Sequence, residues 1–396
     1  MQDNEKKPAL RFKGFTDPWE QRKFEEIAVR SSVMSDKKGL PRVEYEDIIS
    51  GAGRLNKDIK LKESEKVGIV FHKGDVLYGK LRPYLQNWLL ASFNGLAVGD
   101  FWVLQPQNTD SSFLYRLVQS QQFDGGANQS TGTKMPRADW KLVSKTKFAM
   151  PHSVDEQAAI GAYFEHLDTL ITLHQRKYEK LVNIKKSMLD KMFPKNGASV
   201  PEIRFKGFTD LWEQRKVGEL LTERNEQAPM SDEYPLMAFI ANEGVAPKGE
   251  RYDRSALVND TASKLYKKTK FGDFIYSSNN LETGSIGLNK YGKASISPVY
   301  SIFKPTGIAD SDFLGRRLIR KDFINEMVKW RQGVIYGQWR IHESDFIKIE
   351  VTVPTVEEQY KLGLLLDNLD TLITLHQRKL EKLQNIKKSC LEKMFV

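Results

Sequence analysis

The chain has 396 residues, of which 40% are hydrophobic and 28% are charged. This composition is typical of a globular protein with two or three domains. The single cysteine, Cys390, excludes an intramolecular disulfide and favours a reducing compartment. The sequence has no apolar run of about 18 residues and no apolar signal core, so we expect a cytoplasmic protein that does not span a membrane. The formal net charge of +10 is compatible with a polyanionic partner.

The chain opens with an arm, residues 1–23, part of which is repeated later. Residues 11–23 and 204–216 differ only where Pro18 is replaced by Leu211. We place the second copy in a linker and repeated arm at residues 196–216. Internal repeats indicate that one structural unit occurs more than once, and they are therefore the first guide to the fold.

The arm is followed by a first globular domain, which we place at residues 24–152. Apolar and β-branched residues predict strands over 67–71, 75–78 and 101–104, and a short helix over 111–122. The strands do not alternate regularly with helices, which argues against a doubly wound sheet and favours mixed α and β structure.

Two loops of this domain mix basic, hydroxyl and aromatic side chains, as nucleic-acid-binding loops do. Arg pairs with guanine and Asn or Gln with adenine in the major groove, whereas Lys and Ser or Thr suit phosphates. The competing interpretation of each residue is an ordinary solvated turn. The candidate DNA-binding residues of the first domain are Lys80, Arg82, Tyr84, Thr133, Lys134 and Arg137.

A long helix is predicted next, within a central segment at residues 153–195. Apolar residues recur at alternating spacings of three and four, which is the pattern of a coiled-coil seam. Residues 167–193 reappear as 369–395 with four differences, and a second helix is predicted in the C-terminal segment 355–396. The shared seam and the intervening domain predict that the two helices pair antiparallel. The expected seam positions of the first helix are Phe164, Leu167, Ile171, His174, Tyr178, Leu181, Lys185, Met188 and Met192.

The seam contains one histidine in each copy, His174 and His376. We interpret them as a polar layer that fixes the register of the helix pair, and the alternative is a ligand-binding role. Each helix also carries six basic residues against two acidic ones near its end, over 176–191 and 378–393. That face is either solvated or close to nucleic acid or an acidic partner.

The second globular domain, placed at residues 217–354, shares landmarks with the first. Residues 74–78, 101–106 and 113–116 resemble 272–276, 300–305 and 313–316 in the same order. The domains have diverged, whereas the arms and helices are nearly identical. This contrast indicates a common scaffold that carries two modules for different targets, and a functionless duplication would predict uniform divergence. The candidate DNA-binding residues of the second domain are Asn279, Asn280, Lys290, Tyr336, Gln338 and Arg340.

Signatures of catalysis are missing from the sequence. Residues 74–80 fit a P-loop, but Leu81 replaces the required Ser or Thr and the stretch itself is predicted to be a strand. No Asn-Pro-Pro-aromatic motif marks an amino-methyltransferase site, and no His or Cys spacing marks a zinc site. We therefore expect no catalytic residue, no metal and no cofactor in this chain.

The arm motif Pro8-x-Leu10-Arg11-Phe12-x-Gly14-Phe15, followed by Trp19-Glu20, resembles the opening of specificity subunits of Type I restriction–modification systems. The same resemblance holds for the copy from Pro201 and for the domain ends at Pro151 with Glu156-Gln157 and Pro354 with Glu358-Gln359. The resemblance covers essentially the whole chain. The recognition domains of this family vary in sequence, so no base-contacting residue can be transferred from the family to this chain.

The resemblance implies an α+β fold in which two mixed α/β target recognition domains are separated by a long antiparallel two-helix coiled coil. It also implies that each domain binds one half of a bipartite site in double-stranded DNA and that the helices set the gap. The expected partners are two methyltransferase subunits, which bind S-adenosylmethionine, and restriction subunits with ATP-driven translocase activity. The alternatives are an enzyme with duplicated lobes and a stand-alone DNA-binding or coiled-coil adaptor.

Overall fold

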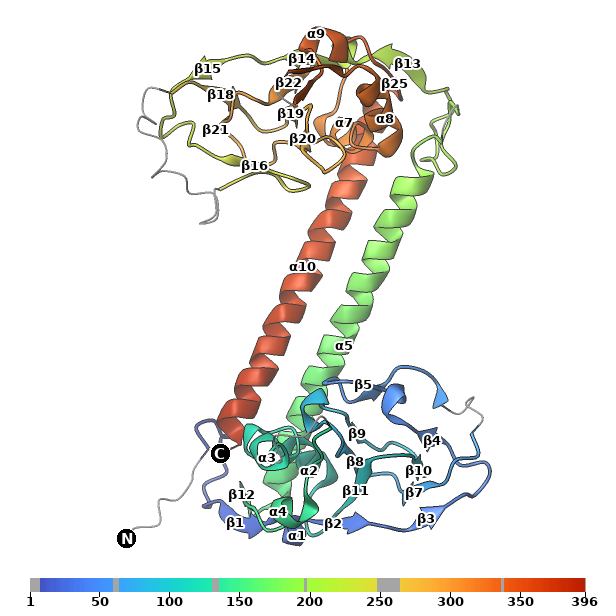
Figure 1. Ribbon diagram of the computed structural model, residues 1–396, viewed down its shortest axis with the longest axis vertical. Helices are drawn as coiled ribbons and strands as arrows, with labels where there is room; N and C mark the ends of the chain where they lie inside the picture. The colour runs from blue at the N-terminus through green and yellow to red at the C-terminus, as the bar shows by residue number, and fades with distance from the viewer. Residues whose placement is uncertain are drawn as a thin grey trace. The chain divides into compact units, whose positions relative to one another are not determined.

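The structure is a computed structural model that describes residues 8–59, 64–129, 135–195, 198–247, 264–335 and 338–395 (Figure 1). The chain divides into two compact units. Unit 1 comprises Met1–Lys177 and His376–Val396, and unit 2 comprises Tyr178–Leu375. Each unit therefore contains one arm, one globular domain and a part of each long helix.

The centre of unit 1 is an antiparallel sheet of four strands in the order β2-β11-β8-β9. Its central strand β11 (FWVLQP) has apolar side chains on both faces, and alternate residues of a strand point to opposite faces. Trp102 and Leu104 pack in the core with the helices, while Phe101 and Val103 pack in a second core against another sheet. The strands are β2 Ala28–Ser31, β8 Val76–Gly79, β9 Trp88–Leu90 and β11 Phe101–Pro106.

Shorter elements complete unit 1. The second sheet has the order β3-β7-β10-β4, and only the β10–β4 pair is parallel. Strand β1 of the arm pairs with β12, just before the long helix. The remaining strands are β1 Glu20–Lys23, β3 Met34–Ser35, β4 Arg42–Val43, β5 Ile48–Ile49, β6 Arg54–Leu55, β7 Gly68–Phe71, β10 Gly95–Ala97 and β12 Lys147–Met150; the short helices are α1 Phe24–Ile27, η1 Tyr45–Asp47, η3 Pro83–Leu85, α2 Ser111–Leu117, α3 Gln121–Ala127 and α4 Trp140–Val143.

Unit 2 repeats this plan, which confirms the internal repeat. Its main sheet has the order β14-β22-β19-β20, and the matched landmarks fall on equivalent elements: β8 with β19, β11 with β22, and α2 with α7. The strands of that sheet are β14 Leu221–Glu223, β19 Phe274–Tyr276, β20 Ile286–Leu288 and β22 Ser301–Pro305.

The other described elements of unit 2 surround this sheet. A second sheet has the order β15-β18-β21, and β13 of the repeated arm pairs with β25. These elements are β13 Glu213–Lys216, α6 Val217–Leu220, β15 Gln227–Ala228, β16 Ala238–Ile240, β17 Gly244–Ala246, β18 Tyr266–Thr269, β21 Ala294–Ile296, α7 Ser311–Arg317, α8 Lys321–Lys329, β23 Gln332–Ile335, β24 Gln338–Arg340, α9 Glu343–Phe346 and β25 Glu350–Val353.

Two helices, α5 (Val154–Lys191) and α10 (Val356–Met394), confirm the helical prediction. Within unit 1 their segments run antiparallel, because Tyr163 contacts Cys390 whereas His174 contacts His376. Within unit 2, Lys185 of α5 forms an ion pair with Asp370 of α10. The predicted seam residues of α5 are all buried or half-buried, which confirms the apolar stripe.

The prediction of one helix over 111–122 is wrong in one respect, because the segment forms one whole helix and the start of another. α2 ends at Leu117, and Ser120 begins α3 by accepting a hydrogen bond from the backbone N–H of Phe123. A serine side chain that caps a helix in this way competes with helix continuation. Within the described ranges, no helix is both long enough and apolar enough to cross a membrane.

Candidate nucleic-acid interface

Two predicted DNA-binding loops of unit 1 lie side by side at the end of the central sheet. One follows β8 and begins at Lys80, and the other precedes α4 and contains Arg137. Leu81 and Arg137 form an isolated antiparallel bridge, and the N–H of Ala138 donates to the carbonyl of Lys80 at 2.8 Å. The N–H of Arg82 donates to the carbonyl of Pro136 at 2.8 Å. These contacts hold the two loops as one surface, which we call the unit 1 loop pair (residues 80–85 and 135–138).

Tyr45 and Asp100 hold the unit 1 loop pair in place through hydrogen bonds and ion pairs. The Tyr45 hydroxyl accepts a hydrogen bond from the N–H of Leu81 at 2.9 Å and donates to the carbonyl of Asp100 at 2.6 Å. Burial raises the pKa of Tyr45, so the hydroxyl stays protonated and keeps donating. Neither residue could be selected from the sequence, because a single tyrosine or aspartate in a turn carries no nucleic-acid signal.

The Asp100 carboxylate orients two of the predicted cations. Its Oδ2 accepts from Arg137 at 3.0 Å, and its Oδ1 lies 3.5 Å from Lys80 Nζ. Burial acts to raise the pKa of Asp100, but the hydrogen bond and charge of Arg137 and the charge of Lys80 outweigh it and the pKa is lowered. The carboxylate therefore remains ionised and holds both cations at the edge of the domain.

The remaining predicted residues of unit 1 differ in accessibility. Tyr84 is 56% exposed and the Arg137 side chain is 55% exposed, so both can reach a ligand. Arg82 adopts a left-handed backbone conformation with φ 49°, and its buried Nε has no hydrogen-bond partner within the part of the chain that the structure describes. Thr133 and Lys134 lie outside the described residues.

Unit 2 has a loop pair in the equivalent place. The segment after β19 contains Asn279 and Asn280, and the segment before α9 contains Arg340. The N–H of Ile341 donates to Ser278 Oγ at 3.0 Å and joins the two segments. Both asparagines are exposed, and Arg340 is 66% exposed with its guanidinium 3.8 Å from Glu343. We call residues 277–283 and 338–341 the unit 2 loop pair.

Arg331 strengthens the unit 2 loop pair. Its guanidinium donates to both carboxylate oxygens of Glu282 at 2.7 Å and to the carbonyl of Ser278 at 3.2 Å. The sequence analysis missed Arg331, although its neighbours Trp330 and Gln332 make the same aromatic, basic and amide mixture that identified the other loops.

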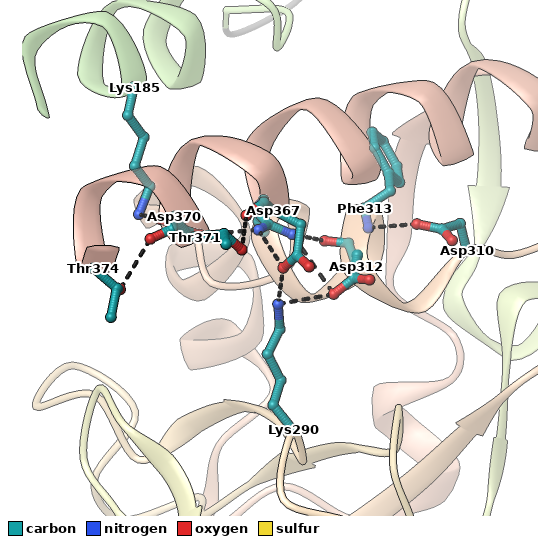
Figure 2. Close-up of polar contacts among 10 residues, drawn as sticks. Lys185, Lys290, Asp310, Asp312, Phe313, Asp367, Asp370, Thr371 and Thr374 are labelled. Atoms are coloured by element: carbon teal, nitrogen blue, oxygen red, sulfur yellow. Dashed lines mark hydrogen bonds and ion pairs between the residues drawn. The ribbon is translucent and has the colours of Figure 1, made fainter. Parts of the chain in front are cut away.

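Of the three remaining predicted residues of unit 2, only Gln338 lies in the described part of the loop pair. Gln338 belongs to strand β24, and Tyr336 lies outside the described residues. Lys290 does not join the loop pair: it forms ion pairs with Asp312 of α7, at 3.0 Å, and with Asp367 of α10 (Figure 2). The structure thus places Lys290 against a long helix, and its assignment to DNA remains a prediction.

Identical residues of the arms and helix starts fix each globular domain on its helix. In unit 1 the guanidinium of Arg11 donates to both oxygens of Glu156 at 2.6 and 2.7 Å, and Trp19 Nε1 donates to Glu156 at 3.3 Å. In unit 2 Arg204 and Glu358 form the same two bonds at 2.7 and 2.6 Å. Such bidentate pairs fix geometry as well as contributing energy.

The glutamine that follows each of these glutamates completes the junction. Gln157 accepts from the N–H of Asp110 at 2.9 Å and donates to the carbonyl of Pro151 at 2.9 Å. Gln359 accepts from Asp310 at 3.0 Å and donates to Pro354 at 2.9 Å. The repeated Pro…Glu-Gln motif is therefore explained by contacts that connect the arm, the helix start and the domain.

The described residues show neither a metal-binding group nor a P-loop turn at residues 74–80. They contain no group of three or more His, Cys, Asp or Glu side chains that could hold a metal ion. Residues 76–79 of the P-loop-like stretch form strand β8, so they do not make the phosphate-binding turn that a P-loop requires. His174 and His376 contact each other in the seam, with 2.8 Å between their Nδ1 atoms.

Comparisons with known proteins identify relatives of one kind. No family model matches the chain. A segment of 127 residues is 25% identical to the Type I restriction enzyme EcoDI specificity subunit of Escherichia coli, over 31% of this chain and 28% of that protein. A segment of 282 residues is 23% identical to the Type I restriction enzyme MjaVIII specificity subunit of Methanocaldococcus jannaschii, over 66% of this chain and 64% of that protein. The chain thus matches less than two thirds of the length of either relative.

A solved structure shares the fold. The S subunit of a Type I restriction–modification system from M. genitalium superposes with a TM-score of 0.61 at 14% identity, covering 98% of this chain and 99% of that chain. The resemblance to Type I specificity subunits that the arm and helix motifs indicate is confirmed by these comparisons, and the mixed α and β fold is shared with that family.

Proposed function

We propose that this chain, which resembles Type I restriction–modification specificity subunits in sequence and fold, selects the DNA sequence on which such a complex acts. Each globular domain (24–152 and 217–354) binds one half of a bipartite site in double-stranded DNA. Segments 153–195 and 355–396 form an antiparallel coiled coil that separates the two domains and sets the gap between the half-sites. The chain supplies specificity and no catalysis.

One observation carries this proposal. The two units place a loop pair at the same position of equivalent sheets, yet the side chains differ: Lys80, Arg82 and Arg137 in one, and Asn279, Asn280 and Arg340 in the other. Arg and Asn make paired hydrogen bonds to different bases in the major groove. Because the arms and junctions around the domains are nearly identical, the difference lies in the domains, whose loop pairs would meet a target.

The nearly identical helices support a proposal about partners. Two methyltransferase subunits bind to α5 and α10, one for each copy of the repeated sequence, and restriction subunits join that assembly. A surface that occurs twice with 23 of 27 residues unchanged suits a partner that is also present twice. S-adenosylmethionine and ATP belong to those partners rather than to this chain.

The experiment that tests the proposed function maps methylated adenines in DNA that carries random sequence, after incubation with the chain and its methyltransferase subunits. We expect one bipartite motif with an unread gap. The chain alone should neither methylate nor cut the same DNA. Methylation or cleavage by the purified chain would instead support an enzyme, and salt-independent DNA association, or none, would support a coiled-coil adaptor.

A further inference from the structure

We propose that two ion clusters, one in each unit, act as positioning residues that fix the angle of each domain on the helices and thereby restrict the gap to one length. This inference rests on the proposed function. The 168 cluster comprises Arg116, Asp168 and Lys387, and the 370 cluster comprises Arg316, Asp370 and Lys185. Each cluster joins three elements: a domain helix, the long helix that follows the domain and the opposite long helix.

The 168 cluster is built around one aspartate of α5. Arg116 of α2 lies 2.8 Å from Asp168 Oδ2, and Lys387 of α10 lies 2.6 Å from Asp168 Oδ1. The Arg116 side chain is only 4% exposed, and its guanidinium also lies over the ring of Phe164 at 5.6 Å from the centroid. An ion pair with one partner this deeply buried is screened little by solvent and resists displacement.

The 370 cluster has the same design in unit 2. Arg316 of α7 lies 3.0 Å from Asp370 Oδ2, and Lys185 of α5 lies 2.5 Å from Asp370 Oδ1. Figure 2 shows Lys185 reaching Asp370 from the opposite helix. The repetition follows from the sequence, since Asp168 and Lys185 belong to the repeated helix block and correspond to Asp370 and Lys387.

Each cluster is a second point of attachment between a domain and its helix. The first is the junction at Glu156 or Glu358, which lies twelve residues before Asp168 or Asp370. At about 1.5 Å of rise per residue, the two points are roughly 18 Å apart along the helix. In unit 1 the apolar side chains of Ile160, Phe164 and Leu167 pack in the domain core between these two points. The ion pairs at the second point add a directional restraint on the tilt of the domain. A fixed tilt allows each loop pair to meet DNA at only one distance from the other half-site.

The two units are not held equally. Unit 2 has an additional link, in which Lys290 contacts Asp367 and Asp312 (Figure 2). Arg316 also lies 3.3 Å from Asp367. The hydrogen bond from Lys290 lowers the pKa of Asp367 in spite of its partial burial, so this carboxylate stays ionised. In unit 1 the equivalent positions of Lys290 and Asp312 are Ser92 and Ser112, which cannot form the link. Unit 1 has further hydrogen bonds instead, from Arg54 to Thr172 of α5 at 3.2 Å and from exposed Gln121 to Glu392 of α10 at 3.3 Å, but no further ion pair equivalent to that of Lys290 among its described residues. The 168 cluster therefore carries a larger share of the restraint on its domain.

The test compares matched variants of the complete methyltransferase complex on DNA substrates that differ only in gap length. Lys387→Gln removes the contact with the opposite helix and leaves Arg116 paired with Asp168. We expect the ratio of methylation at the preferred gap to methylation at gaps one base pair longer or shorter to fall about tenfold, which corresponds to 1.4 kcal/mol. The half-site bases should be unchanged, and Lys387→Arg should restore the ratio.

Unit 2 provides the matched control. Lys185→Gln removes the equivalent contact, but the Lys290 link remains, so we expect a smaller loss of gap selectivity. The double variant Lys185→Gln/Lys290→Gln should lose about as much gap selectivity as the single variant Lys387→Gln. If the Lys387→Gln chain does not assemble with its methyltransferase subunits, the gap selectivity of the double variant tests the inference.

The outcomes separate this inference from the function on which it rests. If the unaltered complex methylates no bipartite motif, the proposed function fails. If it does, and the assembled Lys387→Gln and double variants keep the original gap selectivity, the clusters are structural and this inference is wrong. Altered half-site bases in the Lys387→Gln variant would also contradict it, because a positioning role predicts a change in spacing alone. The double variant is judged by gap selectivity, because Lys290 is itself a candidate DNA-binding residue.

Discussion

Charge placement explains the roles of individual residues in the two units. Guanidinium groups occur in two settings. Buried guanidinium–carboxylate pairs at Arg11 and Arg204 hold the scaffold together, whereas the guanidinium groups of Arg137 and Arg340 are more than half exposed beside Asp100 and Glu343. Sequence patterns alone could not separate these settings, because an arginine in a basic loop and an arginine in an arm motif look alike until their partners are known.

Replacing Arg137 by Ala should affect one half-site only. If the side chain binds a base, discrimination at that position falls by about 1–3 kcal/mol. If it binds phosphate, affinity falls evenly across sequences and the salt dependence becomes weaker. Competition binding with single-base variants of the site, at two salt concentrations, distinguishes these cases. Arg340→Ala is the matched variant for the other half-site, and a change in both halves from either substitution would argue against independent domains.

Replacing Arg11 by Ala should destabilise unit 1 strongly. The Glu156 side chain is 2% exposed, so the substitution leaves a buried carboxylate without its cation, at a cost of about 3–5 kcal/mol. Denaturant unfolding of the purified chain measures this loss. Arg215→Ala is the control, because that guanidinium pairs with exposed Glu213 and its removal should cost less than about 1 kcal/mol. Equal losses in the two variants would show that the Arg11 junction does not stabilise the unit.

At the level of elements, the sequence predicted what is local or periodic and missed what is long-range. The 3.6-residue period and the repeat gave α5 and α10, and apolar runs gave β7, β8 and β11. The contact between loops 80–85 and 135–138 joins residues far apart in the sequence, and the supporting Tyr45 comes from a third segment. Loop residues have no periodicity, so nothing in the sequence indicated that these segments would meet.

We expect the histidine layer of the helix pair to make the free energy of unfolding depend on pH. Burial lowers the pKa of His174, and the facing His376, with Lys379 and Lys177, lowers it further. Because the pKa of His174 is lower in the folded chain, the unfolded chain binds more protons than the folded chain at pH values between and near the two pKa values. The layer's contribution is therefore present above the unfolded pKa of about 6.5 and is lost as the pH falls through that value toward the lower folded pKa.

We therefore expect the free energy of unfolding to rise between about pH 5.5 and 7.5. Parallel denaturant titrations of the chain and of the double variant His174→Asn/His376→Asn should show a steeper rise in the unaltered chain. Asparagine is a suitable replacement because it is tolerated as a polar layer in helix pairs and does not titrate. If the free energy of unfolding depends on pH equally in both proteins, the histidine layer is not the cause of that dependence.

For the whole molecule, repetition is the organising property. Both units attach a mixed α and β domain to a long helix through the same Arg–Glu junction and the same Gln contacts, while the loop pairs differ. The chain therefore consists of a constant scaffold and two variable surfaces. We propose that the surfaces select the bases and that the helices set the distance between the half-sites.

Lengthening the helix pair tests that claim most directly. The four-residue block Leu170–Leu173 recurs as Leu372–Leu375 with the same sequence, so both helices can be lengthened by duplicating it. Four residues add roughly 6 Å and rotate the helix by about 40° beyond a full turn, so the seam is retained. One base pair advances about 3.4 Å, and we predict that the gap of the methylated motif grows by one or two base pairs while both half-sites stay the same. An unchanged gap in an active complex, or altered half-site bases, would contradict the account.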